Sequence, residues 1–399
     1  MTGPAAPCRS AIVGHGRLLP MTGRLVGGTD VIEGPWVVIL ADGRVAQVRA
    51  GGLRPGDPDA VSDVAGALLT PGLVDPHTHL IFAGDRSDEA AARSRGERYT
   101  GGGILRTVRA TAAASDEDLV TATRARLQAA AASGTTTLEV KSGYGLTAAA
   151  ELRLLRLIGE AAAPLRLRVL RTFLGAHAVP EGSTPREQAD AVVAALPGVA
   201  AEADFIDAFC EPGIFDLELT RRILDAGRQH GLGLRLHADQ LEHSGGARLG
   251  VAMGALSVDH LEHADEDDAR ALAGSSTVAT ILPGPALLLR SGRPPVRALL
   301  EAGACVALGS DANAGTFGTP SMPLAVGLAV AIGFSVDEAL WAASAGGARS
   351  LGLDGRAGVL RPGAAADLVA WDAQHEGDFA VRVGAVAPLR TWIGGEVAA

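Results

Sequence analysis

The chain has 399 residues, of which 47% are hydrophobic and 20% are charged, so it is long and apolar enough to bury a large core. Its formal net charge of -10 offers no basic surface to nucleic acids or anionic membranes. Because it has neither an apolar stretch long enough to span a bilayer nor a secretory leader, we expect a cytoplasmic protein that acts on a small molecule.

Short β-prone runs separated by turn signals occupy both ends of the chain. In the run 35–44, Asp42 and Gly43 predict a hairpin turn between two strands. Similar runs return at residues 366–371 and 389–397. We therefore expect one small β-sandwich domain built from residues 1–66 and 357–399.

Between the two ends, apolar β-rich runs alternate with helical segments, which is typical of βα units around a parallel sheet. Eight strands would close a (β/α)8 barrel of the TIM type, which we assign to residues 67–356. An open doubly wound sheet is the alternative, although no G-x-G-x-x-G or phosphate-binding loop supports it. The expected strands are residues 68–74, 135–140, 166–174, 204–210, 233–236, 256–258, 277–282 and 305–308.

Three of the helical segments between these strands have clear start signals. Ser115, Thr147 and Thr184 stand just before them, where a side-chain oxygen can accept a hydrogen bond from the first helical turn. Pro185 follows Thr184 at the first helical position, which proline tolerates well.

Polar residues follow nearly every expected strand. In a βα barrel the active site forms at these C-terminal strand ends, so the residue types there predict the chemistry. Taken singly, each has a plainer explanation: a hydrogen-bonded loop histidine, a helix cap for Asp311, or an ion pair between Lys141 and Glu139. However, five of the ten histidines occupy strand ends, and this clustering favours a site. The residues are Asp75, His77, His79, Lys141, Tyr144, His177, Glu211, His237, Gln240, Asp259, His260, Ser310 and Asp311.

Three histidines and one aspartate after strands 1, 5 and 8 would suit Zn²⁺ or Fe²⁺, with room left for water. A metal ion lowers the pKa of a bound water from about 16 to near 7. The pattern therefore predicts hydrolysis of a polarised carbonyl or amidine carbon.

Two longer motifs, "PGLVDPHTH" at residues 71–79 and "LRPGAAADLVAWD" at residues 360–372, resemble those of the amidohydrolase superfamily. The histidines after strands 5 and 6 and the aspartate after strand 8 fit the same pattern. Within the superfamily, the chain is most similar to the imidazolonepropionase family, over nearly its whole length. The motifs that carry this likeness are "DPHTHLIFAGDR" (75–86), "EVKSGYGLT" (139–147), "TFLGAHAVP" (172–180), "LHADQ" (236–240), "SVDHLEH" (257–263) and "SDANAGT" (310–316).

The resemblance implies hydrolysis of 4-imidazolone-5-propanoate to N-formimidoyl-L-glutamate in histidine degradation, by attack of a metal-activated water on the ring carbonyl. It implies one divalent or trivalent metal ion, zinc or iron, and a homodimer. The implied metal ligands are His77, His79, His237 and Asp311. The implied catalytic residues are Asp311, His260 and Gln240. The implied substrate contacts are Arg86, Tyr99, Tyr144, His177, Gln240, Asn313, Gly315 and Thr316.

Two functional alternatives accompany this interpretation. The first is a related aminohydrolase acting on a purine or formimidoyl compound. Deaminases of the superfamily carry a proton-transferring glutamate where this chain has Gln240, and an amide is unable to take that role. The second alternative is a metal-bound scaffold or sensor without catalysis.

Lys141 leaves two roles open. In some amidohydrolases a carboxylated lysine bridges two metal ions, but that lysine lies on the fourth strand, whereas Lys141 follows the second. An orienting or structural charge beside a single metal ion is the favoured interpretation.

Overall fold

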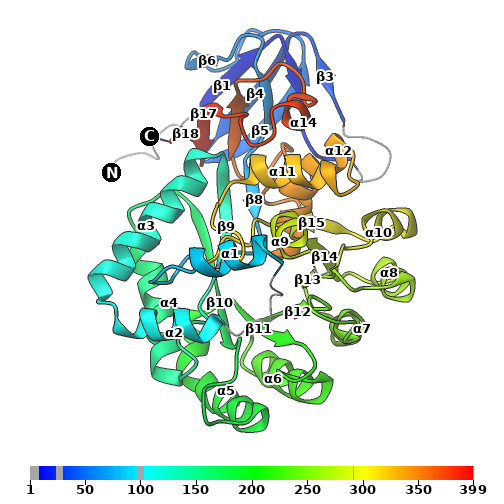
Figure 1. Cartoon of the computed structure of the whole chain (residues 1–399). Coiled ribbons are helices and arrows are strands. Elements are labelled where there is room, and N and C mark those ends of the chain that lie inside the picture. The colour runs from blue at the N-terminus through cyan, green and yellow to red at the C-terminus, as the bar shows by residue number, and fades with distance from the viewer. Residues whose placement is uncertain (1–8, 24–29, 97–102, 291, 399) are drawn as a thin grey trace.

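The computed structural model describes residues 9–23, 30–96, 103–290 and 292–398. Within them, a β-sandwich lies at one end of a β/α barrel (Figure 1). None of the helices in these ranges is long and apolar enough to cross a membrane. Tyr99, one of the expected substrate contacts, lies outside the described residues.

The barrel sheet has eight parallel strands that neighbour one another in chain order, so the predicted (β/α)8 architecture is confirmed and the open doubly wound alternative is wrong. Backbone hydrogen bonds from Asp311 N to His77 O (3.0 Å) and from His79 N to Ala312 O (2.9 Å) join the first strand to the last. The strands are β8 (Leu73–Asp75), β9 (Thr135–Lys141), β10 (Arg168–Ala176), β11 (Phe205–Cys210), β12 (Gly233–Ala238), β13 (Ser257–His260), β14 (Val278–Ile281) and β15 (Val306–Leu308).

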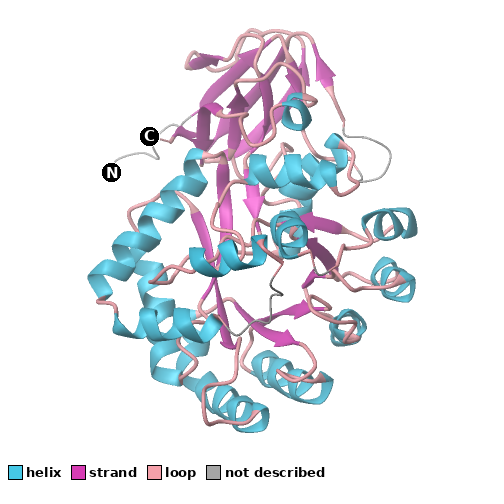
Figure 2. Ribbon diagram, in the orientation of Figure 1, coloured by secondary structure: helices cyan, strands magenta, loops and turns pink. Residues whose placement is uncertain are grey.

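Helices alternate with these strands and surround the barrel sheet, and one last short helix follows the barrel in the chain (Figure 2). They are α1 (Ser87–Ser94), α2 (Ile104–Ala113), α3 (Asp116–Ala132), α4 (Ala148–Ala162), α5 (Pro185–Val199), the 3-10 helix η1 (Ala200–Glu202), α6 (Leu217–Gln229), α7 (Gly246–Met253), α8 (Glu266–Ala273), α9 (Pro283–Leu289), α10 (Val296–Ala302), α11 (Met322–Ala331), α12 (Val336–Trp341), the π-helix η2 (Ala342–Gly346), α13 (Gly347–Ser350) and α14 (Asp378–Val381).

The three predicted helix starts are confirmed. Ser115 caps α3 and Thr147 caps α4, each accepting a hydrogen bond from a backbone N–H of the first turn. At α5, Thr184 and Glu187 form a reciprocal capping box, with Pro185 at the first helical position.

Two sheets built from both ends of the chain form the sandwich, and buried side chains from both sheets share one apolar cluster. The hairpin turn at Asp42 and Gly43 is confirmed, with positive φ at both residues (50° and 73°). The first sheet contains β5 (Arg44–Ala50), β4 (Trp36–Ala41), β1 (Arg9–Gly14) and β6 (Val61–Asp63). The second contains β18 (Glu396–Val397), β17 (Pro388–Ile393), β16 (Leu368–Trp371), β7 (Leu68–Pro71), β2 (Arg17–Leu18) and β3 (Ile32–Glu33).

The prediction of one barrel strand over residues 68–74 is wrong, because this run forms two strands. β7 pairs with β16 in the sandwich, and only β8 belongs to the barrel. The chain changes sheets at Gly72, whose N–H donates to Asp367 O (2.9 Å) and whose Cα faces the Thr136 side chain. Both pieces are fully buried, so the apolar run shows no break where the sheets change.

We expect Gly72→Ala to lower the free energy of unfolding by about 1–3 kcal/mol, because the added methyl group would collide with Thr136 in a packed region. Urea denaturation measures the change. Gly52→Ala is the matched control, since a methyl group there meets nothing within 4 Å, and it should stay within about 0.5 kcal/mol. Equal stability of the two variants would contradict this account of the junction.

Candidate active site

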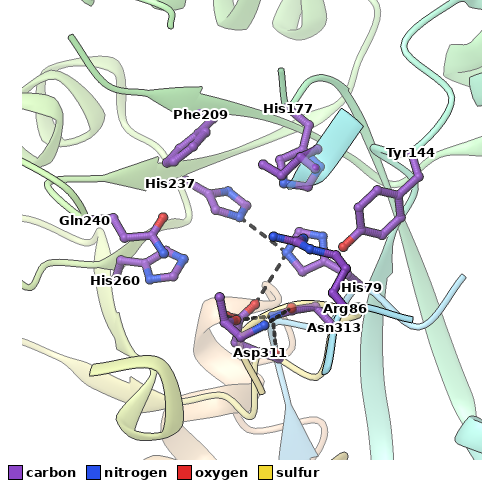
Figure 3. Close-up of a pocket in the computed structure, with 12 residues that line it drawn as sticks. His79, Arg86, Tyr144, His177, Phe209, His237, Gln240, His260, Asp311 and Asn313 are labelled. Carbon is purple, nitrogen blue, oxygen red and sulfur yellow. Dashed lines mark hydrogen bonds and ion pairs between the residues drawn. The ribbon is translucent and has the colours of Figure 1, made fainter. Parts of the chain in front are cut away.

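The C-terminal ends of the barrel strands enclose one cavity, and most of the predicted site residues line it (Figure 3). Phe209 and Ile104 also line it, although the sequence analysis assigned neither of them to the site. His77 is completely buried at its edge. The lining residues are His79, Arg86, Ile104, Tyr144, His177, Phe209, His237, Gln240, His260, Asp311, Asn313 and Thr316.

Candidate ligand atoms of four side chains lie close together beside this cavity. Nε2 of His79 lies 3.3 Å from Nε2 of His77 and 3.4 Å from Nε2 of His237. Oδ1 of Asp311 lies 3.6 Å from the His77 nitrogen and 3.5 Å from that of His79. Tetrahedral ligands at about 2.1 Å from a metal ion would be roughly 3.4 Å apart. These spacings are compatible with a single metal ion held by the close group His77, His79 and Asp311, which His237 adjoins through His79.

The ionisation of these groups also suits metal binding. Burial holds the pKa of His77 and of His79 well below the usual range, and burial also lowers the pKa of His237. These lowered pKa values favour neutral imidazoles, the form that ligation requires. Burial raises the pKa of Asp311 to about 6, and a bound cation would favour its charged form.

Two buried carboxylates face the other ring nitrogens of these ligands. Oδ2 of Asp259 lies 2.7 Å from Nδ1 of His77, and Oδ2 of Asp207 lies 3.0 Å from Nδ1 of His237. Carboxylates in this position orient an imidazole and select the tautomer whose Nε2 can bind a metal ion. The sequence analysis missed Asp207, although a lone acidic residue in an otherwise apolar strand is a usable signal.

His260 lies beside the metal ligands, and its ring forms a second close group with His77 and His237. Burial opposes its protonation, but the Glu262 carboxylate, 3.4 Å away, helps to raise the pKa of His260 above its usual value.

Two candidate site residues have an unusual backbone conformation: φ is +84° at His260 and +53° at Asp311. Non-glycine residues in such conformations are often found where a functional side chain must be aimed.

Lys141 is completely buried and contacts carboxylates. Its Nζ lies 2.6 Å from Oε1 of Glu139 and 2.8 Å from Oδ2 of Asp207. Burial acts against the charged amine, but Asp207 and Glu139 offset it and raise the pKa of Lys141. Carboxylation requires a neutral amine, so these contacts favour an orienting ammonium over a metal-bridging lysine.

Arg86 is only 3% exposed, and its guanidinium reaches the cavity (Figure 3). Nε and Nη2 donate to Oε2 of Glu89, at 3.0 and 2.8 Å, which fixes the orientation of the planar group. Gly315 packs so closely against the guanidinium that no side chain would fit there. Gly315, an expected substrate contact, thus lies beside the residue expected to bind the substrate carboxylate. Glu89 was not predicted at all.

The remaining predicted residues lie around the candidate metal ligands. The His177 ring stacks on His79 at 5.1 Å between centroids, and the Tyr144 ring lies 5.4 Å from His177. Oδ1 of Asn313 accepts hydrogen bonds from the backbone N–H of Gly315 and Thr316, both at 2.8 Å. Asn313 therefore shapes the loop that follows Asp311.

Gln240 is 5% exposed and borders the cavity at the end of β12. Glu211, which follows β11, accepts hydrogen bonds from the backbone N–H of Gln240 (2.6 Å), Leu241 (3.0 Å) and Glu242 (3.3 Å). Glu211 thus fixes the turn that carries Gln240. The role of Glu211 at its strand end is therefore structural.

Comparison with known proteins agrees with this geometry. The sequence profile of the amidohydrolase family matches residues 68–398. An imidazolonepropionase from Salinispora tropica is 46% identical, over 92% of this chain and 95% of the relative. One from Nocardia farcinica is 42% identical, over 98% of both chains. The chain belongs to the imidazolonepropionase family of amidohydrolases.

Solved structures similar to this imidazolonepropionase-family chain support the fold. An adenosine deaminase from Xanthomonas campestris with bound zinc superposes with a TM-score of 0.74, at 19% identity, over 99% of this chain and 93% of that one. Atrazine chlorohydrolase from Arthrobacter aurescens, complexed with zinc, gives 0.75 at 19% identity, over 97% and 94% of the two chains.

Removing one ligand from this imidazolonepropionase-family site should release the metal. We expect His237→Ala to lose metal and activity together, because only three protein ligands remain. Metal analysis of the purified variant measures the loss. The control is His243→Ala, whose side chain is 39% exposed and pairs with Asp268 outside the cavity. If both variants kept their metal, His237 would not be a ligand.

Proposed function

We propose that this chain hydrolyses 4-imidazolone-5-propanoate to N-formimidoyl-L-glutamate, a step of histidine degradation. The oxygen of water adds to the ring carbonyl carbon, the ring C–N bond breaks, and the departing nitrogen takes up a proton. Because that nitrogen remains tethered, the ring opens without releasing a fragment. The 41–46% identical relatives named imidazolonepropionase support this assignment.

The buried guanidinium of Arg86 is the observation that carries the choice of substrate. It borders the same cavity as His79, His237 and Asp311. A planar guanidinium can bind a carboxylate through two parallel hydrogen bonds, which makes an arginine at this cavity a suitable partner for an acidic substrate. We assign Arg86, Tyr99, Tyr144 and His177 to the propanoate and the ring. Asn313, Gly315 and Thr316 are assigned to the other side of the ring.

The ligand set suits Zn²⁺ or Fe²⁺, since imidazole binds both and one carboxylate accompanies three imidazoles. When bound, such an ion supplies a water of lowered pKa and polarises a carbonyl oxygen. Zinc in the two solved neighbours makes it our first choice. Metal analysis of protein isolated without added metal would distinguish zinc from iron.

We assign the proton transfers to groups of the chain itself. Oδ2 of Asp311, which lies 3.3 Å from the Thr316 hydroxyl, accepts a proton from water and later returns it to the ring nitrogen. His260, whose protonated form Glu262 stabilises, donates a hydrogen bond to the developing oxyanion. Gln240 binds substrate by hydrogen bonds and transfers no proton. A cytoplasmic location and a homodimer stay predictions, and light scattering would test the latter.

The product distinguishes this function from that of an aminohydrolase. Metal-loaded protein should remove the absorbance of imidazolonepropanoate without releasing ammonia. Ammonia as the direct product would instead support a deaminase. Tight ligand binding without turnover would support a metal-bound scaffold.

Arg86→Ala should leave metal content unchanged while lowering kcat/KM on imidazolonepropanoate by about tenfold to a hundredfold or more. The reason is that a charge-assisted bidentate pair contributes about 1.5–3 kcal/mol. Arg86→Lys should recover only part of the loss, because an ammonium lacks the planar fork. Steady-state kinetics and metal analysis measure both effects.

The control for this prediction is Arg106→Ala, which removes an exposed arginine paired with Asp88 at 2.6 Å. Its kcat/KM should change by less than about threefold, since exposed ion pairs contribute little. An imidazolone without the acid group completes the test. Equal losses for Arg86→Ala on both substrates would remove Arg86 from the carboxylate site.

A further inference from the structure

Lys141 is the only lysine of the chain, and it belongs to a cluster of five charged side chains that have no exposed surface. The cluster lies inside the barrel, on the Nδ1 side of two candidate metal ligands. It contains three carboxylates and two cations, so its net charge is negative. Its members are Glu139, Lys141, Asp207, Arg235 and Asp259.

The ammonium of Lys141 and the imidazole of His237 share one carboxylate oxygen. Oδ2 of Asp207 lies 2.8 Å from Nζ of Lys141 and 3.0 Å from Nδ1 of His237. Oδ1 of Asp207 accepts a hydrogen bond from the backbone N–H of His237 at 3.1 Å. The carboxylate is therefore held between the ligand's own strand and the lysine.

Arg235 lies behind His77, the other candidate ligand with a carboxylate partner, as Lys141 lies behind His237. Its Nη2 lies 3.1 Å from Oδ2 of Asp259, the oxygen that contacts Nδ1 of His77 at 2.7 Å. Arg235 also donates to the backbone carbonyls of Pro76 (2.8 Å) and Ser350 (2.7 Å), so it is fixed from several sides. The ammonium of Lys141, by contrast, contacts the carboxylates of Glu139, Asp207 and Asp259, the last at 3.8 Å.

Loss of Lys141 would leave three buried carboxylates facing one cation. Repulsion between Asp207 and Asp259 is weakly screened in a water-free interior, so Asp207 would move from its place against His237. The imidazole would then lose the contact that sets its rotation. Its Nε2, now 3.4 Å from Nε2 of His79, would no longer be held at the metal position.

We propose that Lys141 is a positioning residue of the metal site, whose ammonium holds Asp207 against Nδ1 of His237 and thereby aims Nε2 of that ligand. The inference rests on the metal site of the proposed function and not on its substrate. The competing explanation is that Lys141 only neutralises Glu139, 2.6 Å away, and contributes to folding alone.

Lys141→Met, which keeps the length of the side chain and removes its charge, distinguishes these explanations. We expect Zn²⁺ affinity, measured by competition with a chelator, to fall about 10- to 100-fold, as is usual when an outer partner of a metal ligand is lost. The visible absorption of the Co²⁺-substituted protein should also change, because it reports ligand geometry. Native affinity and a native Co²⁺ spectrum would overturn the proposal.

The matched control is Gln188→Met, another exchange of a buried polar side chain for methionine. Gln188 donates to the backbone carbonyls of Leu146 (2.8 Å) and Gly175 (2.9 Å) and to no carboxylate. It should lose stability while keeping the native Zn²⁺ affinity and Co²⁺ spectrum. An equal loss of affinity in this control would show that destabilisation alone weakens the site, and the proposal would fail.

Asp207→Asn tests the same link from its other side, and it gives the answer should Lys141→Met not fold. It should weaken Zn²⁺ binding to a similar extent, and unchanged affinity would overturn the proposal. In the double variant, Lys141→Met should add less than about twofold to the effect of Asp207→Asn, because the two act through one contact. Additive losses would show that Lys141 acts elsewhere.

His237→Ala separates a failure of this inference from a failure of the proposed function. If His237→Ala releases the metal while Lys141→Met binds it normally, the metal site is as proposed and Lys141 has no part in positioning it. If His237→Ala retains native affinity, the metal site itself is wrongly assigned.

Discussion

The contacts between two buried carboxylates and two imidazoles are the interaction on which the candidate site depends. Asp259 and Asp207 contact Nδ1 of His77 and of His237, so each ring presents Nε2 to the cavity. Buried carboxylates are costly unless cations and hydrogen bonds compensate them. Lys141 on β9 and Arg235 on β12 supply those cations, and this requirement explains why the barrel interior is charged where most barrels are apolar.

The barrel makes this arrangement available because alternate residues of a strand point to the same side. Arg235 and His237 both point inward from β12, two residues apart, so the compensating cation lies one layer below the ligand. The same alternation places Glu139 and Lys141 in the interior from β9. The barrel strands thereby place a layer of buried, mutually compensating charged side chains beneath the layer of candidate metal ligands.

The loops that follow the barrel strands carry the side chains that we propose to bind the substrate. Arg86 follows the first barrel strand and is held by Glu89, while the loop after Asp311 packs Gly315 against the guanidinium. Three of the four candidate metal ligands, His77, His79 and Asp311, are therefore carried by the same two adjoining segments as Arg86, while His237 comes from β12. The separation of these two segments is set by the closure of the barrel between β8 and β15.

Much of the architecture follows from local pattern. Alternation of apolar runs with capped helices predicted eight βα units, since hydrophobic periodicity and N-cap chemistry are properties of short segments. Residues 68–74 were misread as one strand because burial on both sides of Gly72 leaves no polar residue to mark the change of sheet. A bend in a buried run is decided by packing, here by Thr136 and the carbonyl of Asp367.

The sequence by itself determined the kind of chemistry, because histidines and an aspartate at strand ends become neighbours in any closed βα barrel. It also named Arg86, Gln240 and His260, through motifs that stay contiguous in the chain. Only the tertiary structure revealed Asp207, Arg235 and Glu89 as partners of those groups. Asp207 and Arg235 meet their partners across different strands, and residue order does not encode which buried charge meets which. Glu89 lies only three residues after Arg86, but its contact depends on how the chain folds between the first barrel strand and α1.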